Sequence, residues 1–452
     1  MSNLSGVLSR DFELMLEPGV YLMPLPRPES GRGAVLYAPI ANTILPLTDA
    51  QAELLSENAG DPSVIGLFLD ALLGKERSGL SREPGAMDAY RPTSVALMMT
   101  TTCQLRCTYC YAEAGSTPSQ HLAKEASFAA IDFISQNAVS LGKPSIVVHF
   151  HGAGEPTLRW DHIWECLDYA RSAASRNGLS LRTVITTNFC LPPDRAILLA
   201  ERIDRLIVSC DGPPDVMNEN RPMLHDDSGA VLEAALQAVS RAGLADKLRV
   251  RATMTRKTQG RLPEFVRYFS ALGMKHLYLV SVSGTGRGAR HESVDVEVFL
   301  ASWRSAVRVA HEQGLTLDHP VLDLDQLRPE GFACGINGSN FALMPDGSVS
   351  VCYEAVVPGS QQAKAFQIGG YSPENRTFQT SLPLINHIRS EYHVSRRQVC
   401  DTCFCRLTCA GRCAAREMSP TGAPRDMAMT DGCDITRSLT AEIIQALAYE
   451  ET

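Results

Sequence analysis

Short apolar runs alternate with amphipathic stretches through the middle of the chain, between residues 94 and 315. The runs are rich in aliphatic and β-branched side chains, and the stretches between them carry apolar residues at helical spacing. The expected strands are 94–99, 145–150, 182–187, 205–209, 248–254 and 277–282, and the clearest expected helices are 123–139, 160–177 and 230–242. This alternation predicts six parallel βαβ units, and therefore an α/β fold built on a partial, TIM-like (β/α)6 barrel. In such a barrel, the loops at the carboxyl ends of the strands are available for chemistry.

The first 90 residues predict a small separate α+β unit. Two strand-like runs, 19–23 and 34–46, precede helical apolar spacing over 49–57 and 64–73. The next stretch, 78–87, is rich in Gly, Ser, Pro and charge, which is typical of a linker.

From about residue 330 onward, cysteine, glycine and proline become frequent and the periodicity fades. A segment of this kind would bury little apolar surface alone and would need metal to hold its shape. We therefore expect three domains: a small N-terminal domain over 1–90, the partial barrel over 91–320 and a cysteine-rich domain over 321–452.

The composition agrees with two or three compact globular units. The chain has 452 residues, of which 44% are hydrophobic and 20% are charged, so wholesale disorder is excluded. A formal net charge of -8 without blocks of Lys and Arg makes the chain a poor candidate for a nucleic-acid binder. No apolar run approaches the roughly eighteen residues of a membrane span, and the first residues lack the features of a signal peptide. We therefore expect a cytoplasmic protein without a nucleic-acid partner or a membrane span.

Fourteen cysteines need a separate explanation. In a reducing compartment, cysteines at short spacings indicate metal or redox chemistry rather than disulfides. Cys103, Cys107 and Cys110 follow the first expected strand with the spacing C-x3-C-x2-C. Three thiolates on one loop can hold three corners of a cubane iron–sulfur cluster and leave one iron without a protein ligand. A structural zinc site is the alternative, but it wants a fourth close ligand, and no His or Cys follows within reach of the loop.

This loop, with Tyr109 just before the third cysteine, resembles the signature of the radical S-adenosylmethionine (radical SAM) superfamily. The resemblance implies a 4Fe–4S cluster on the three cysteines whose open iron binds S-adenosylmethionine (SAM), with Tyr109 beside the cofactor. It also implies a reducing electron donor of the flavodoxin or ferredoxin type. The electron cleaves SAM, and the resulting 5′-deoxyadenosyl radical abstracts a hydrogen from the substrate. The cofactor then carries the difficult chemistry, while the protein supplies position and exclusion of water.

A glycine-rich segment after the second expected strand, H-G-A-G-E-P, resembles the Gly-Gly-Glu-Pro loop of the same family. Ala153 replaces the first glycine of the family's pair. Gly154 lets the backbone approach the methionine part of SAM, and Glu155 can accept a hydrogen bond from its ammonium group. In front of this loop, His149 and His151 share one face of the expected strand, and we expect them to serve packing and hydrogen bonding near the cavity.

Further expected SAM contacts end the third and fourth strands. The resemblance assigns a ribose contact to Ser209 and a pairing with the cofactor carboxylate to Arg221, because a guanidinium fork suits a carboxylate. Asn188 is a further candidate. An ordinary surface charge at Arg221 and a turn residue at Asn188 remain the alternatives. The glycine-rich run 284–288 lacks the rest of a dinucleotide fingerprint, so we expect backbone near the adenine or a flexible loop.

Seven further cysteines form a spaced pattern in the last third of the chain. The pattern resembles the SPASM extension of radical SAM enzymes, which carries auxiliary iron–sulfur clusters. The resemblance implies two auxiliary clusters of the 4Fe–4S type. Their implied ligands are Cys400, Cys403, Cys409 and Cys433 for one cluster and Cys334, Cys352 and Cys413 for the other.

The family's pattern often includes an eighth cysteine. In this chain Asn340 occupies that position, so one ligand of the pattern is missing. The cluster on Cys334 therefore has an open iron or a different fourth ligand. Cys405 is a candidate, but it lies between ligands of the other cluster, which favours a free or structural thiol. Of the remaining cysteines, Cys166 is expected to be a small buried apolar residue, whereas Cys190 and Cys210 lie at strand ends on the mouth side of the barrel, which leaves their role open.

SPASM proteins mostly act on peptides or proteins. Our first hypothesis is therefore an enzyme that modifies a ribosomally made precursor peptide by hydrogen abstraction, which yields a crosslink, a thioether or an oxidised residue. The first 90 residues resemble the small winged-helix module that binds leader peptides as an added strand at a sheet edge. The alternative is that they only cover the barrel.

Two other functions stay open. One is a protein maturase, either of a sulfatase by formylglycine formation or of a quinone-type enzyme by crosslinking. The sulfatase-maturing branch carries an Asp directly after the second auxiliary cysteine, proposed as its base, whereas this chain has Tyr353 followed by Glu354. The other is a non-enzymatic electron-transfer protein, which would gain nothing from an open iron. The candidates for a catalytic base are Asp211, Tyr353 and Glu354.

Overall fold

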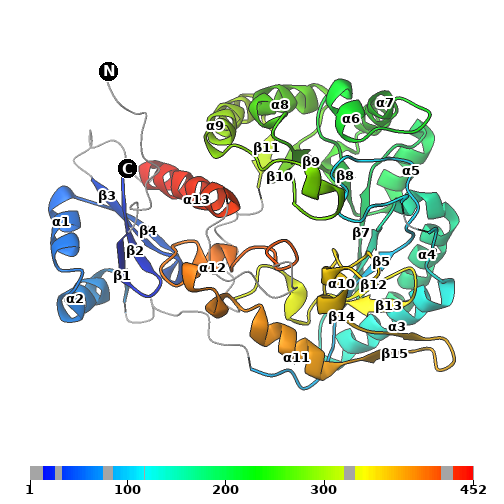
Figure 1. The fold of residues 1–452 in the computed structure, drawn as a ribbon, viewed down its shortest axis with the longest axis horizontal. Helices are drawn as coiled ribbons and strands as arrows, with labels where there is room; N and C mark the ends of the chain where they lie inside the picture. The colour runs from blue at the N-terminus through cyan, green and yellow to red at the C-terminus, as the bar shows by residue number, and fades with distance from the viewer. Residues whose placement is uncertain are drawn as a thin grey trace.

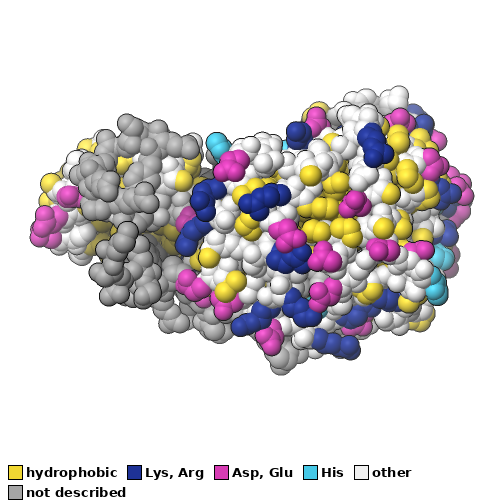
Figure 2. All heavy atoms as spheres, turned by 90° about the horizontal axis from the view of Figure 1, so that it is seen from above, with side chains coloured by type: hydrophobic (Ala, Val, Ile, Leu, Met, Phe, Trp, Pro, Cys, Tyr) yellow, Lys and Arg dark blue, Asp and Glu magenta, His cyan; other side chains and the backbone are white. Residues whose placement is uncertain are grey.

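The computed structural model describes residues 14–25, 33–74, 85–116, 118–319, 331–418 and 431–450. Most of the expected linker, 78–84, lies outside this set, as do the first thirteen residues. Among the described residues, no helix is both long and apolar enough to cross a lipid bilayer. On the face in Figure 2, basic and acidic side chains are interspersed over the described part of the surface.

Seven parallel strands form the scaffold, in the order β11-β10-β9-β8-β7-β6-β5. The sheet curves, with helices along its outer side (Figure 1). The six strands expected from the sequence are confirmed to within two residues at either end, and β11 is an addition to them. The strands are β5 (Ser94–Met98), β6 (Ser145–His151), β7 (Ser180–Thr187), β8 (Arg205–Ser209), β9 (Leu248–Met254), β10 (His276–Ser281) and β11 (Thr316–Asp318).

The two faces of this sheet have different environments. Successive side chains of a strand point to opposite faces, and β6 alternates accordingly: Val148 and Phe150 are fully buried, whereas His149 and His151 on the other face are not. The first residues of β9 alternate in the same way, with Arg251 on the less buried face. One face therefore packs on helices, while the other lines a cavity.

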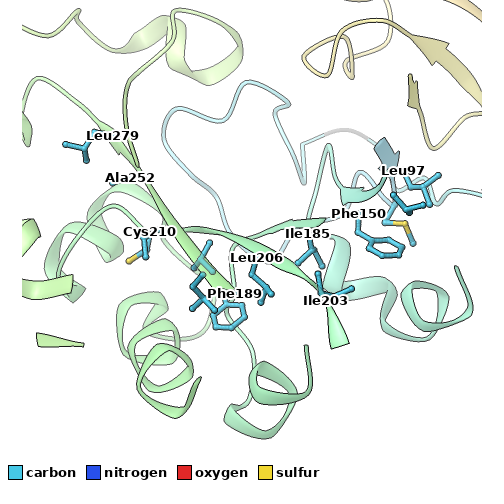
Figure 3. Packing of buried hydrophobic residues seen from close by; sticks show 14 of the residues in the cluster. Leu97, Phe150, Ile185, Phe189, Ile203, Leu206, Cys210, Ala252 and Leu279 are labelled. Carbon is cyan, nitrogen blue, oxygen red and sulfur yellow. The ribbon is translucent and has the colours of Figure 1, made fainter. Parts of the chain in front are cut away.

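The outer helices bury their apolar faces against the sheet. On α4, Ile163, Cys166, Leu167 and Ala170 recur at helical spacing and are fully buried. Figure 3 shows core side chains from the strands gathered beside these helices. The helices are α3 (Lys124–Ser140), α4 (Trp160–Arg176), α5 (Pro193–Arg202), α6 (Pro214–Asn220), α7 (Ser228–Arg241), α8 (Leu262–Ala271) and α9 (Val296–Gln313).

The cysteine-rich part continues the barrel sheet. Strand β12 pairs in parallel with β5, and β13, β14 and β15 follow as antiparallel neighbours, so one sheet has eleven strands. The backbone of Ala342 in β12 lies opposite that of Ala96 in β5. The elements here are β12 (Ala342–Leu343), β13 (Ser348–Ser350), α10 (Gln361–Phe366), β14 (Gln367–Ser372), β15 (Thr377–Thr380), α11 (Leu382–Glu391), α12 (Arg406–Cys409) and α13 (Asp431–Glu450).

The N-terminal unit is a four-stranded antiparallel meander followed by two helices. Helix α2 begins at Pro62, and the Asp61 side chain accepts from the Ser63 and Val64 amides as a cap. One face of the sheet packs on the two helices, and the other packs on Phe404 and α13. The elements are β1 (Leu14–Glu17), β2 (Val20–Pro24), β3 (Ala34–Ala38), β4 (Thr43–Leu47), α1 (Asp49–Glu57) and α2 (Pro62–Leu73).

Candidate active site

A cavity of about 970 Å³ lies on the inner face of the parallel strands. Its wall combines the cysteine loop after β5, the loop after β6, the inner faces of β8 to β10, and residues 353, 354 and 416 of the cysteine-rich part. The carboxyl ends of parallel strands meet at one edge, which brings loops distant in sequence together. Of the expected site residues, those that line the cavity are Cys103, Cys107, Tyr109, Cys110, Gly154, Glu155, Asn188, Ser209, Arg221, Tyr353 and Glu354.

The cysteine loop is fixed by backbone hydrogen bonds to the segment after α6. The Arg106 amide donates to the Pro222 carbonyl at 2.8 Å, and the Thr108 amide donates to the Asn220 carbonyl at 2.8 Å. The Arg106 guanidinium also binds the carbonyl oxygen of Cys103 at 2.7 Å. These contacts hold a loop without regular structure in one conformation, as three ligands of one cluster would require.

The glycine-rich loop after β10 clamps the same cysteine loop. The Arg287 amide donates to the Cys110 carbonyl at 3.0 Å, and Arg287 Nε donates to the Cys107 carbonyl at 2.9 Å. A Cβ on Gly286, whose φ is +56°, would lie 2.6 Å from the Cys110 carbonyl oxygen. The sequence reasoning missed this role, since three glycines around one arginine carry no motif for a contact with another loop.

The loop after β6 packs on the start of the cysteine loop. The Gly154 amide donates to Thr100 and the Glu155 amide to Thr102, both at 2.8 Å. A Cβ on Gly154 would lie 2.0 Å from the Thr102 carbonyl oxygen, closer than real Cβ contacts. A residue without a side chain is therefore required at position 154, because the backbones of two loops of the protein touch there.

Glu155 joins three parts of the site. Its Oε1 accepts from the Thr157 amide at 3.0 Å and from the hydroxyls of Thr157 and Thr187 at 2.7 Å each, while Oε2 accepts from the Asn188 amide at 2.7 Å. Burial raises the pKa of Glu155, against the effect of these hydrogen bonds. The side chain is only 2% exposed, so the expected contact with an ammonium group would add to an existing network.

Asp211 is fully buried and does not line the cavity. Its Oδ1 accepts from Arg221 Nη2 at 2.9 Å and from the Thr253 amide at 2.9 Å. Its Oδ2 accepts from Asn220 Nδ2 at 3.1 Å and from the Tyr109 hydroxyl. With four donors on its two oxygens, the carboxylate holds Arg221 and Tyr109 in place. This environment argues against the expected role as a catalytic base.

Arg221 is a buried cation at the cavity wall, so it is not the surface charge that the sequence left open. Its guanidinium lies 5.3 Å from the centre of the Tyr109 ring, within the range of a cation–π contact. Its Nε is buried without a hydrogen-bond acceptor among the described residues. A buried donor of this kind fits the carboxylate of SAM.

Asn188 and Ser209 reach the cavity from adjacent strands. Asn188 Nδ2 lies 3.8 Å from Cys103 Sγ, and Asn188 Oδ1 accepts from Gln104 Nε2 at 3.2 Å. Asn188 therefore contacts the cysteine loop directly. Ser209 ends β8 and is 8% exposed at the cavity wall.

The chemistry of the three thiols fits a cationic cluster. Burial, with Glu155 and neighbouring cysteines acting in the same direction, raises the pKa of Cys103 to about 12, and burial raises the pKa of Cys107 to about 11 against the effect of Arg221. Metal binding removes these thiol protons and compensates the buried charge. Among the described residues, no three Cys, His, Asp or Glu side chains converge on a single metal ion. A cubane does not need such convergence, since each thiolate binds a different iron.

The other cysteines fall into two electrostatic groups. Besides burial, the pKa of Cys352 is raised by Cys413 and Cys334, whereas the pKa of Cys400 is raised by Cys403, Cys409 and Cys433. This division of neighbours is the same as the division of cluster ligands that the resemblance implies. The ligand assignments themselves stay predictions.

Asn340 and Cys405 are the two residues that depart from the family's cysteine pattern, and both make contacts that stabilise the fold. Asn340 Nδ2 donates to the Val351 carbonyl at 3.1 Å, and so ties the segment after Cys334 to β13. Cys405 is 1% exposed in an apolar cluster with Tyr21 and Tyr37 of the N-terminal sheet. The expectation that Cys166 is buried is confirmed, and Cys190 and Cys210, whose role the sequence left open, are buried as well.

Tyr353 and Glu354 form the wall opposite β6. The Tyr353 ring lies against both His149 and His151, with centroid distances of 6.3 Å and 6.0 Å. Burial raises the pKa of Tyr353 to about 12. Glu354 Oε1 pairs with Arg416 at 2.6 Å, and Glu354 Oε2 is buried without a hydrogen-bond donor among the described residues.

Known proteins resemble the chain at two levels. The profile of the radical SAM superfamily matches residues 97–279. The AdoMet-dependent heme synthase of Oleidesulfovibrio alaskensis is 27% identical over 232 residues, which are 48% of this chain and 54% of that protein. This match thus spans about half of that relative. The mycofactocin maturase MftC of Mycolicibacterium smegmatis is 25% identical over 347 residues, 74% of this chain and 81% of that protein.

Two solved structures share the fold. Native anSMEcpe with bound AdoMet aligns with a TM-score of 0.63 at 18% identity and covers 80% of this chain and 100% of its own. SuiB of Streptococcus suis bound to S-adenosylmethionine aligns with a TM-score of 0.52 at 15% identity and covers 91% of this chain and 98% of its own. The similarity to both includes the parallel sheet and extends well beyond residues 97–279.

Proposed function

Because the chain is an enzyme of the radical SAM superfamily, we propose that it modifies a ribosomally made precursor peptide by hydrogen abstraction. The observation that carries this proposal is the continuous cavity from the three-cysteine loop to Tyr353 and Glu354. Its volume of about 970 Å³ is near the upper limit of small-molecule sites, roughly 300–1,000 Å³, which leaves room for a substrate segment beside a cofactor.

In this proposal, Cys103, Cys107 and Cys110 bind the 4Fe–4S cluster, and Gly154, Glu155, Asn188, Ser209, Arg221 and Tyr109 surround SAM. The support is that all nine line one cavity. When bound and reduced, the cluster and SAM supply the radical that abstracts hydrogen. The protein holds Arg221 toward the cavity through Asp211, and the loops around Gly154 and Arg287 fix the cysteine loop.

Of the three candidate bases, Glu354 has the surroundings that best suit proton transfer. The Arg416 ion pair orients the carboxylate of this cavity-lining residue, and Oε2 is buried without a hydrogen-bond donor among the described residues. Tyr353 would rarely be deprotonated near neutral pH, because burial raises its pKa to about 12. Asp211 already accepts from four donors. We therefore assign proton transfer to Glu354.

Two auxiliary clusters complete the proposal. The group of Cys334, Cys352 and Cys413 borders Glu354, since Glu354 raises the pKa of both Cys352 and Cys413. The second group lies beside the N-terminal sheet, where the Tyr21 hydroxyl donates to the Cys403 carbonyl at 3.1 Å. The clusters would carry electrons away from the substrate, with potentials set by burial and hydrogen bonds to sulfur.

The N-terminal unit is proposed to bind the leader of the peptide. Both faces of its sheet are covered, one by α1 and α2 and one by Phe404 and α13. A leader strand would therefore join at an edge, β1 or β4, in the way that sheets capture extended peptides. MftC, a relative that the chain matches over most of its length, is named a maturase, which supports a modifying role.

Sulfatase maturation is the second candidate, supported by the shared fold of anSMEcpe. Tyr353 stands directly after Cys352, where the sulfatase-maturing branch carries its Asp, and its raised pKa suits it poorly to replace a carboxylate base. This difference favours the peptide proposal.

The test is anaerobic turnover of reconstituted protein with SAM, a reductant and the peptides encoded next to the gene. We expect 5′-deoxyadenosine and a mass change in one peptide. Cys107→Ala should abolish both, whereas Cys166→Ala, a change in the core of α4, should abolish neither. A loaded wild-type enzyme that never forms 5′-deoxyadenosine would contradict the radical mechanism. A mass change in a sulfatase peptide alone would favour the second candidate.

A further inference from the structure

Arg251 stands on the inner face of β9, in the middle of the cavity wall. In the sheet register it lies opposite Ser209 of β8 and opposite Tyr278 of β10. Its guanidinium interacts electrostatically with Arg221, Arg416, Tyr111 and Tyr278. It therefore occupies the space between the cysteine loop and the wall that carries Glu354.

Three of the other four arginines that line the cavity have acceptors of their own. Arg221 pairs with Asp211 at 2.9 Å, Arg416 pairs with Glu354 at 2.6 Å, and Arg249 donates to the Asp246 and Leu248 carbonyls. Arg251 has no hydrogen-bond acceptor or acidic partner among the residues that the structure describes.

The charges around Arg251 make this lack of a partner costly. Burial lowers its pKa, and the positive charges of Arg416 and Arg221 lower it further. Arg251 is partly buried at the cavity wall, where an anion with good hydrogen bonds would offset its partial desolvation. Five arginines but only three carboxylates line the described cavity wall, and the carboxylate behind the wall, Asp211, is paired with Arg221, so none of these carboxylates forms an ion pair with Arg251.

We propose that Arg251 binds a carboxylate of the peptide substrate, either the C-terminus or an Asp or Glu side chain. This inference rests on the proposed function, because it names the feature of the peptide that the cavity selects. The planar guanidinium fork matches a carboxylate in bidentate geometry. The charged neighbour that acts most strongly on Arg251 is Arg416, the partner of Glu354, so Arg251 reaches toward the wall that carries Glu354.

The test uses cluster-loaded protein with SAM and three pools of synthetic octapeptides. One pool has free C-termini without Asp or Glu, a second has amidated C-termini with Asp and Glu, and a third has amidated C-termini without them. Peptides retained after rapid gel filtration are quantified by mass spectrometry. We expect wild type to retain the first or second pool about tenfold better than the third, because peptides of the third pool have no carboxylate to pair with Arg251.

Two variants of Arg251 and one control at Arg249 test the residue itself. Arg251→Gln should lose the preference, Arg251→Lys should recover part of it, and Arg249→Gln should keep it, because Arg249 donates to backbone carbonyls. The pool that wild type retains distinguishes a C-terminal from a side-chain carboxylate.

Three results would overturn the inference. Equal retention of all pools by wild type would refute it and leave the peptide proposal standing. A SAM affinity that falls as much in Arg251→Gln as in Arg221→Gln, measured by anaerobic equilibrium dialysis, would assign Arg251 to the cofactor. Retention of no pool by any variant would count against peptide binding itself, and the inference would fail with it.

Discussion

Arg287 Nε donates a hydrogen bond to the carbonyl oxygen of Cys107 at 2.9 Å, so the loop after the sixth barrel strand holds the loop of the first three cysteines. The same side chain reaches the Ala114 carbonyl at 3.3 Å and the Ser116 hydroxyl at 3.1 Å. One guanidinium thus fastens the middle of the cysteine loop and the segment that follows it. Arg287 and Cys107 are 180 residues apart in the sequence, and their hydrogen bond ties the two loops together.

Arg287→Ala should loosen the cysteine loop and reduce 5′-deoxyadenosine formation about tenfold or more. The physical reason is that three side-chain hydrogen bonds are lost, two of them partly buried, at about 1 kcal/mol each. Iron content per chain and the rate of SAM cleavage measure the effect. Arg290→Ala, an exposed change in the same loop, is the matched control. Equal behaviour of the two variants would contradict the role of Arg287.

Gly154→Ala should damage the same region from the opposite side. The new methyl group would lie 2.0 Å from the Thr102 carbonyl oxygen, so the two loops would have to separate. Overpacking of this kind costs about 1–3 kcal/mol. Urea unfolding and SAM affinity are the measurements. Gly284→Ala is the control, since nothing lies within 4 Å of its added Cβ. A Gly154→Ala variant with wild-type SAM affinity would show that the loop contact is dispensable.

The sequence predicts the parallel core well for a physical reason. Barrel strands and outer helices differ in the spacing of their apolar residues, so the sequence distinguishes them. Each expected helix begins and ends within two residues of its expected bounds, as α4 shows at Trp160–Arg176. The division of the later cysteines into two groups is implied by the resemblance to the SPASM extension and not by their spacing, since Cys409 and Cys413 are close in sequence but belong to different groups. The electrostatic groups of Cys352 and Cys400 agree with that division.

The sequence could not predict contacts that depend on tertiary pairing. Strand β12 has only two residues, Ala342 and Leu343, and its periodicity gives no sign that it joins β5. Nor does sequence reveal that Asp211 is saturated with donors while Glu354 keeps a free oxygen, since both are single carboxylates near strand ends or cysteines. Such differences arise only from what the fold places around each group.

Asp211→Asn should destabilise the protein and weaken SAM binding. Removing one partner of a buried ion pair leaves the other charge uncompensated, which costs about 3–5 kcal/mol. Arg221 would then lack its acidic partner within the cavity wall. Urea unfolding and anaerobic SAM titration measure the two effects. Asp215→Asn, which removes an exposed pair with Arg261, should cost at most about 1 kcal/mol. A stable Asp211→Asn variant with normal SAM binding would refute the positioning role.

His151 should make the protein less stable in mild acid. Burial lowers its pKa to about 4, and the nearby Arg251 contributes to this shift. An unfolded histidine titrates near pH 6.5, so the unfolded chain binds more protons between pH 6.5 and 4. The free energy of unfolding should therefore fall as the pH drops through this window, by up to about 3 kcal/mol, and stay constant above it.

The check on His151 is urea unfolding at pH 7 and pH 5 for wild type and His151→Gln. The variant should lose less stability on acidification than wild type. His225→Gln, at an exposed loop position, should behave as wild type does. His149, whose ring contacts His151 at a centroid distance of 4.9 Å, also has a pKa lowered by burial, so the variant should flatten the dependence only in part. An unchanged dependence would contradict the assignment.

Cys403→Ala should separate SAM cleavage from peptide turnover. Cys403 belongs to the cysteine group beside the N-terminal sheet, away from the cavity wall, so 5′-deoxyadenosine should still form while the modified peptide does not. Iron content should fall by about one cluster per chain, since a ligand is lost. Cys405→Ala is the matched control two residues on: it removes a buried sulfur among Tyr21, Tyr37 and Phe404, and should cost stability but keep the iron. Loss of SAM cleavage in a folded Cys403→Ala variant, equal to that in Cys107→Ala, would contradict separate roles for the two cysteine groups.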